Sequence, residues 1–267
     1  MNHSTMQESN DNQLTFGGHL EVLRRMLFRI LGVTLVLAIG VFVVKDIVWE
    51  LLLAPSKSDF VTYRLIEQML QGIGVDFQVE EYNVDLIATE LSSQFMTHVT
   101  TSFYLGLLLA SPYILLELFR FILPALYDNE RKYSVLVAII IYSLFIIGVL
   151  MSYFVIFPIS FRFLGTYSVS ETISSMITLK SYISTFTSLT VVMGIVFQLP
   201  VIIFILAKMG VVNFHILAEY RKYAFFIITV ISAIITPPDI LSCLLVTLPL
   251  YLLYECSIWV AKKTYRQ

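Results

Sequence analysis

The chain has 267 residues, of which 58% are hydrophobic and only 13% are charged, and its formal net charge at pH 7 is −2. A soluble globular protein carries about 25% charged residues, so this chain cannot cover its surface with polar groups in water. We therefore predict an integral membrane protein, and the slightly negative charge excludes a typical nucleic-acid-binding protein. The two cysteines, Cys243 and Cys256, are too few for a disulfide scaffold.

Six apolar segments follow a polar tail over residues 1–18, which we expect to be flexible and cytoplasmic. They predict an all-α polytopic fold in which residues 19–267 form one membrane domain of six transmembrane helices. The expected spans are about 26–45, 98–123, 133–157, 181–208, 223–236 and 240–260. As a helix, the uncharged run Tyr223–Ile235 of the fifth segment would be roughly 20 Å long, against a hydrocarbon core of roughly 30 Å. We expect the bilayer to thin locally beside it.

Basic residues near the ends of the spans predict the orientation in the membrane. With the N-terminus inside, twelve basic residues fall on the inner side and five on the outer side. The inner residues are Arg24, Arg25, Arg29, Arg120, Arg131, Lys132, Lys208, Arg221, Lys222, Lys262, Lys263 and Arg266, and the outer residues are Lys45, Lys57, Arg64, Arg162 and Lys180. We therefore expect both termini to lie in the cytoplasm.

The first outer loop, residues 45–97, contains nine acidic residues and three basic ones. Within it, residues 66–70 and 84–95 show the amphipathic patterns that are typical of short helices at a membrane surface. Pro55 follows an apolar run and is expected to turn the chain at the outer interface.

Polar side chains inside the spans are candidates for function, because an uncompensated polar group is costly in lipid. Gln198 and Thr190 lie on one face of the fourth segment. Gln198 either satisfies a neighbouring helix or provides a polar spot in a groove that faces lipid or a peptide. Glu117 is expected to pair with Arg120, three residues later, and Glu255 near the end of the sixth span is expected to be structural.

A second group of acids lies on the predicted inner surface. Asp128 and Glu130 follow Pro124 in the first inner loop, and Glu21 precedes the first span. This loop is either a solvated turn or part of a site in which two carboxylates hold a cation, and the guanidinium group of arginine matches a carboxylate best. We found no zinc, phosphate-loop or nucleophile motif, so we expect no catalytic activity and no metal or other cofactor.

Six short motifs occur in order along the chain. They are HLEVLRR at 19–25, SPYIL at 111–115, FILPALYDNER at 121–131, FQLP at 197–200, TPPD at 236–239 and LYE at 253–255. Together they resemble the TatC family, the receptor subunit of the twin-arginine protein translocase. The resemblance extends over about residues 19–260, which is nearly the whole chain.

The resemblance implies a cup-like scaffold of six transmembrane helices in the bacterial cytoplasmic (inner) membrane. Such a protein binds twin-arginine signal peptides at its cytoplasmic face and exports folded proteins, driven by the proton-motive force. Its partners would be TatA-type and TatB-type single-span subunits, further copies of itself and membrane lipid. The alternative that the residues leave open is a proton-coupled secondary transporter for small molecules, although no internal repeat supports it.

The resemblance also implies roles for particular residues. Glu130 matches the family's signal-binding acid in the first inner loop. The second family acid has no direct match, because Val22 stands in its place; Glu21, rotated by about 100° on a helix, or Asp128 would have to supply it. Gln198 occupies the family's buried Glu or Gln position. We expect it, together with Thr190 and Glu255, to face partner helices or the signal peptide. Other positions that match family motifs are Pro55, Pro112, Phe121, Pro124, Pro237, Pro238 and Asp239.

Overall fold

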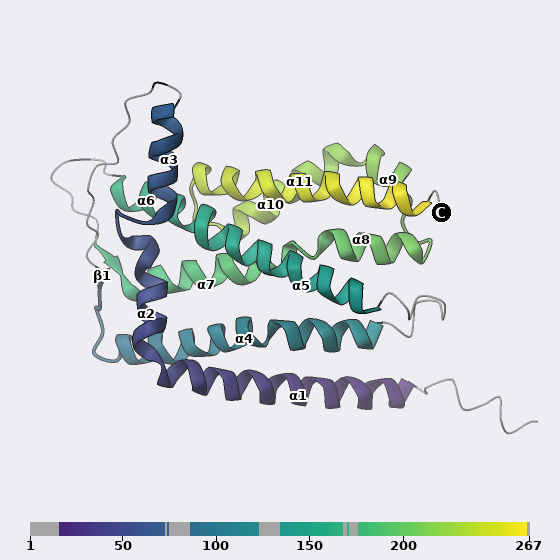
Figure 1. Cartoon of the computed structure of the whole chain (residues 1–267), viewed down its shortest axis with the longest axis horizontal. Helices are drawn as coiled ribbons and strands as arrows, with labels where there is room; N and C mark the ends of the chain where they lie inside the picture. The colour runs from purple at the N-terminus through teal and green to yellow at the C-terminus, as the bar shows by residue number, and fades with distance from the viewer. Residues whose placement is uncertain are drawn as a thin grey trace, which may run out of the picture.

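A bundle of long helices makes up most of the computed structural model, which describes residues 16–72, 74, 86–122, 134–167, 170 and 176–265 (Figure 1). The long helices lie side by side along the longest axis of the molecule. They are α1 (Phe16–Val43), α4 (Ser93–Ile122), α5 (Ser134–Met151), α7 (Leu179–Val196) and α11 (Ile240–Tyr265). The shorter helices are α2 (Lys45–Leu53), α3 (Val61–Gly72), α6 (Phe157–Thr166), α8 (Leu199–Lys208), α9 (Phe214–Glu219) and α10 (Arg221–Ile235).

Five stretches of the described residues are long and apolar enough to cross a membrane. They are Leu20–Val43, Ser93–Phe121, Val137–Thr166, Leu179–Lys208 and Ile240–Lys263. In each stretch, no more than 44% of the most apolar part is buried inside the protein. Most of this apolar helix surface therefore requires lipid. The prediction of a polytopic helical membrane protein is therefore confirmed. The predicted fifth span, 223–236, corresponds to α10, whose 15 residues make a helix roughly 22 Å long, and the count of six spans stays a prediction.

Two of the spans contain an interruption. In the third, a π-helical turn, η4 (Ser152–Ile156), joins α5 to α6, and the helix continues to Thr166 instead of ending near residue 157 as predicted. It continues because Pro158 lies in the first turn of α6, where a missing N–H costs least. In the fourth span, α7 ends before Gln198, and α8 begins with Pro200 in its first turn.

Glycines allow two pairs of helices to pack closely. A Cβ atom built at Gly106 of α4 would lie 2.7 Å from the backbone nitrogen of Ala38 in α1. At Gly148 of α5 it would lie 2.6 Å from the carbonyl oxygen of Met193 in α7. Small residues at such contacts let membrane helices approach one another, and the resulting van der Waals contacts stabilise the bundle.

The two termini of the described chain lie at one end of the bundle, which we call the inner end, and α2, α3 and β1 lie at the other, outer end (Figure 1). A 3₁₀ turn, η1 (Ala54–Ser56), follows α2 and contains Pro55, as the predicted turn requires. The predicted helix over residues 66–70 is part of α3. The helix predicted over 84–95 is wrong, because Leu86–Ile87 (β1) instead pairs in parallel with Ile177–Thr178 (β2) of a distant loop, and α4 begins only at Ser93.

The main hydrophobic core lies where η4 and α6 pack against α7 and α11. Its centre is aromatic: the Phe157 ring meets the rings of Tyr182 and Phe186 edge-to-face, with centroids 5.0 Å apart in both cases. Tyr182 donates its hydroxyl hydrogen bond to the carbonyl oxygen of Leu52, at 2.8 Å. This bond attaches α2 to the outer part of the bundle.

Candidate functional site

The acids predicted to bind a cation are only partly within the described residues. Glu21 is exposed on the first turns of α1, and its carboxylate pairs with Arg25 of the same helix. Val22, at the position of the missing family acid, is also exposed. Pro124, Asp128 and Glu130 lie outside the described residues. The structure therefore places Glu21 at the inner end of the bundle, with Arg25 of the same helix as its partner.

Glu117 forms a further acidic site near the inner end of α4. Its carboxylate accepts a hydrogen bond from the Tyr113 hydroxyl at 2.9 Å, and the Arg29 Nη1 atom of α1 lies 3.8 Å away. The predicted pair with Arg120 is wrong, because the carboxylate's partners among the described residues are Tyr113 of the same helix and Arg29 of α1. Only 12% of the Glu117 side chain is exposed. Arg29 lies near the start of the first span, and its sequence position gives no sign of this pairing.

Gln198 lies at the break between α7 and α8. Its side-chain nitrogen donates a hydrogen bond to the carbonyl oxygen of Ile141 in α5, at 3.1 Å. Of the two alternatives for this residue, the structure thus supports the one in which the amide satisfies a neighbouring helix.

Thr190 lies two turns before this break and is also turned toward the third span. Its hydroxyl donates to the Phe186 carbonyl oxygen at 2.8 Å and lies 3.2 Å from the Ser152 hydroxyl of η4. A Cβ atom built at Gly194 would lie 2.6 Å from the Phe145 ring. The polar face of α7 is therefore packed against α5 and η4.

Glu255 connects α10 and α11 near the inner end of the bundle. Its two carboxylate oxygens lie 2.9 Å from Nε and 3.0 Å from Nη2 of Arg221, which is a bidentate arrangement. Tyr251 adds a hydrogen bond from its hydroxyl at 3.1 Å. This geometry holds the short helix α10 against α11.

We expect Glu255→Gln to lower the free energy of unfolding by about 1 kcal/mol, because it removes the charge from a pair that is partly screened by solvent. The measurement is thermal unfolding of the purified protein in detergent. Glu219→Gln is the matched control, since Glu219 is exposed on α9 and forms no ion pair with the described residues. Equal shifts for the two variants would contradict the prediction.

The family-motif residues that are described have local structural roles. Asp239 Oδ1 accepts a hydrogen bond from the Ser242 backbone N–H at 2.6 Å and so caps the start of α11 after Pro237 and Pro238. Pro55 is buried, and its carbonyl oxygen accepts from the Tyr63 hydroxyl at 3.1 Å. Two further residues lie on α4: Pro112 inside the helix and Phe121 near its inner end. Among the described residues, no three His, Cys, Asp or Glu side chains are grouped so as to hold a metal ion.

Comparison with known proteins identifies the family. The family model described as Sec-independent protein translocase protein (TatC) matches residues 18–249. The TatC protein of Blattabacterium sp. subsp. Periplaneta americana (strain BPLAN) is 33% identical over 258 residues, which cover 95% of this chain and 97% of that protein. TatCy of Bacillus subtilis (strain 168) is 37% identical over 188 residues, or 70% of this chain and 74% of that protein.

A solved structure agrees with these relatives. The crystal structure of a twin-arginine translocase receptor, TatC, is 31% identical in sequence and superposes with a TM-score of 0.73. The match covers 92% of this chain and 99% of the chain in the crystal. Sequence and fold thus agree along almost the entire length, and the chain belongs to the TatC family of Sec-independent protein translocase proteins.

Proposed function

We propose that this chain is the receptor subunit of a twin-arginine translocation system, which binds twin-arginine signal peptides and takes part in the export of folded proteins. The observation that carries the proposal is the similarity to a solved twin-arginine translocase receptor over 92% of the chain. This similarity argues against the alternative of a proton-coupled small-molecule transporter. The protein acts by binding, without catalysing a reaction of its own, and the proton-motive force supplies the energy.

The signal peptide binds at the inner end of the bundle, where an arginine guanidinium meets the carboxylate of Glu130. A carboxylate and a guanidinium form two parallel charge-assisted hydrogen bonds, which a lysine cannot reproduce. Glu21 is a second partner only if the peptide displaces Arg25 from it. This exchange costs little, because both side chains of the pair are at least half exposed and such ion pairs contribute roughly 0–1 kcal/mol. Asp128 is the other candidate for the second acid.

Partner subunits of the TatA and TatB types and further copies of this chain pack against its membrane-facing surface. The short helix α10 supports this, because the bilayer has to thin beside it or protein has to shield it. Gln198, Thr190 and Glu255 already have partners within this chain, so a partner helix would meet them only after local rearrangement. The protein resides in the bacterial cytoplasmic membrane. The distribution of its basic residues supports an orientation with both termini in the cytoplasm.

Site-specific crosslinking tests this assignment. A photo-crosslinker is placed at position 21, 22, 128 or 130, and a radiolabelled twin-arginine signal peptide is added to membranes that contain the full chain. We expect the strongest product from position 130, and a product from 21 or 128 identifies the second acid. A peptide with two lysines in place of the arginines is the control and should give several-fold less product. Equal products from both peptides, or none from any position, would refute the proposed site.

A further inference from the structure

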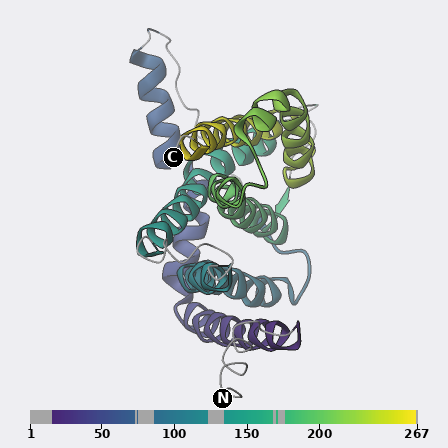
Figure 2. The same cartoon turned by 90° about the vertical axis from the view of Figure 1, so that its right-hand side faces the viewer.

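Helix α3 differs from the other helices in its direction and position. It runs across the long helices at the outer end of the bundle, so it lies roughly parallel to the membrane plane (Figure 1). Viewed from the inner end, it extends beyond the outline of the bundle (Figure 2). Both views place its C-terminal half away from the spans, above the area that lipid or a neighbouring protein must occupy.

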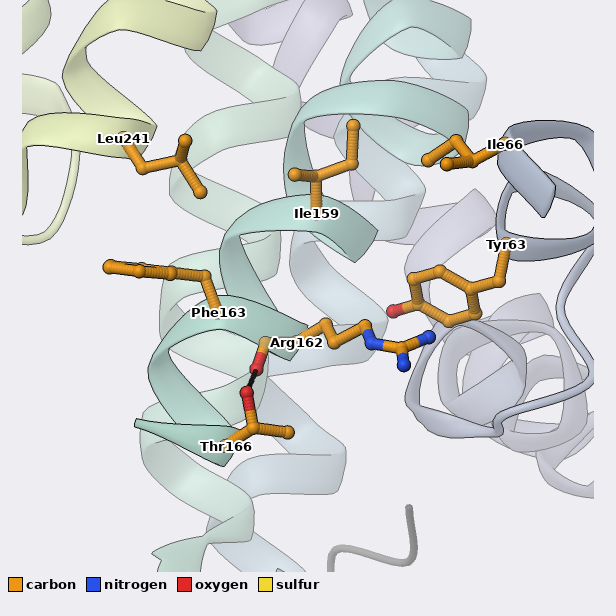
Figure 3. Close-up of a pocket in the computed structure, with 7 residues that line it drawn as sticks. All are labelled: Tyr63, Ile66, Ile159, Arg162, Phe163, Thr166 and Leu241. Atoms are coloured by element: carbon orange, nitrogen blue, oxygen red, sulfur yellow. Dashed lines mark hydrogen bonds between the residues drawn. The ribbon is translucent and has the colours of Figure 1, made fainter. Parts of the chain in front are cut away.

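One face of α3 fixes the helix to the bundle. Thr62 donates a hydrogen bond to the Phe154 carbonyl oxygen, and the buried Tyr63 donates to the Pro158 carbonyl oxygen at 2.8 Å. Figure 3 shows Ile66 pointing toward Ile159 and Tyr63 beside Arg162 of α6, whose guanidinium carbon lies 5.1 Å from the centre of the Tyr63 ring. These residues line a cavity of about 230 Å³ between α3, α6 and the start of α11. The orientation of α3 about its own axis is therefore determined.

A second face of α3 is apolar and exposed. Val61, Leu65 and Met69 are spaced by four residues and so follow one another along a single side of the helix. Their exposed fractions are 53%, 53% and 69%. Successive residues are about 100° apart around the helix axis. The apolar stripe therefore lies next to the face that contacts the bundle, and the polar residues occupy the remaining side of the helix. The polar residues are Arg64, Glu67, Gln68 and Gln71.

The N-terminal end of α3 lies beside a lipid-facing surface of the bundle. The Phe60 ring, directly before α3, stacks on the ring of Phe154 with centroids 5.9 Å apart, and Phe154 is an exposed residue of the third span. The start of α3, which carries Val61, is thus fixed beside the lipid-facing surface of that span at its outer end. The bundle covers one face of α3 and the polar residues favour water, so the apolar stripe between these two faces needs an apolar surrounding, which the bilayer beside the third span supplies. A helix of this kind lies in the membrane interface with its apolar face in the lipid.

We propose that α3 is a membrane-anchoring helix that binds the outer leaflet through Val61, Leu65 and Met69. The occupant of the apolar stripe is lipid, and the helix extends the contact between the protein and the membrane beyond its spans. The proposal is independent of signal-peptide binding, because it concerns the opposite end of the bundle.

Fluorescence quenching tests the position of α3. Cys243→Ala and Cys256→Ala remove the native thiols, and a single cysteine at 65 or 69 is labelled with NBD; matched controls carry the label at 67 or 68 on the polar face. The full chain is reconstituted in vesicles of phosphatidylethanolamine and phosphatidylglycerol. We expect lipid-attached nitroxides to quench labels at 65 and 69 several-fold more than labels at 67 and 68, and aqueous iodide to show the opposite order.

Two results would overturn the proposal. Similar iodide quenching at all four positions would place the apolar stripe in water. Labels at 65 and 69 that are protected from both quenchers, with protection that disappears as the lipid-to-protein ratio rises, would show that a second copy of the chain covers the stripe. Strong quenching of the labels at 65 and 69 by the lipid-attached nitroxides, unchanged with this ratio, supports the proposal.

Discussion

Export of a reporter with a twin-arginine signal peptide should be lost when Glu130 is replaced by alanine. A hydrogen bond to a charged group contributes about 1.5–3 kcal/mol, so its removal should weaken peptide binding roughly 10- to 100-fold. Glu130→Gln keeps a hydrogen-bond acceptor but loses the charge, and we expect it to fall between the wild type and Glu130→Ala. The measurements are the exported fraction of the reporter and the yield of the crosslink to its signal peptide.

The control for this experiment is Glu219→Ala, which removes an exposed acid that follows the inner end of the fourth span. It changes the net charge by the same amount but should leave export unchanged. If Glu130→Ala exports the reporter at the wild-type rate with an undiminished crosslink, another group binds the arginine. Glu21 would then be the first residue to consider, since it is exposed and its partner Arg25 is exchangeable.

The second large effect is expected for Gly106→Ala, which should destabilise the protein by about 1–3 kcal/mol. The added methyl group would lie 2.8 Å from the Cα and Cβ atoms of Ala38, and backbone atoms cannot move aside without separating α1 from α4. In an unrestricted helix the same substitution is stabilising by about 0.5–1 kcal/mol, so the sign itself is informative. Thermal unfolding in detergent measures the change in stability.

Gly40→Ala is the matched control, because a Cβ atom at Gly40 of α1 meets nothing within 4 Å. It should leave the stability unchanged or raise it slightly. Gly106→Ala should also reduce signal-peptide crosslinking, because α1 carries Glu21 and α4 leads to the loop that contains Glu130. A variant as stable as Gly40→Ala would show that α1 and α4 do not pack through this glycine.

The spans were predictable because lipid leaves the backbone few choices. A long apolar segment in a bilayer has to satisfy its own N–H and C=O groups, which only a helix can do within one segment, so composition alone predicts helices such as α5. The helix end expected near residue 157 was wrong for a local reason: a proline usually interrupts a helix, but Pro158 lies in the first turn of α6, directly after the π-helical turn.

The remaining errors depend on contacts between distant segments. The amphipathic pattern of residues 84–95 gave no sign that Leu86 pairs with Ile177, 91 residues later. Glu117 has a possible partner one turn away, in Arg120, yet its carboxylate meets Arg29 of another helix. Gln198 was a candidate because of its cost in lipid, but whether it faces a neighbour or a groove depends on how α5 packs beside it. Such pairings follow from tertiary packing, which a single sequence does not show.

The parallel pairing of β1 with β2 also sets an order on biogenesis. Leu86–Ile87 leaves the ribosome before α4, whereas Ile177–Thr178 follows the third span. Two complete membrane crossings separate the strands, so β1 lacks its partner until both have been inserted and β2 has been translocated. The two strands can therefore pair only after the first three spans have reached their final orientation in the membrane. Failure of either crossing to insert would leave the two strands on opposite sides of the membrane.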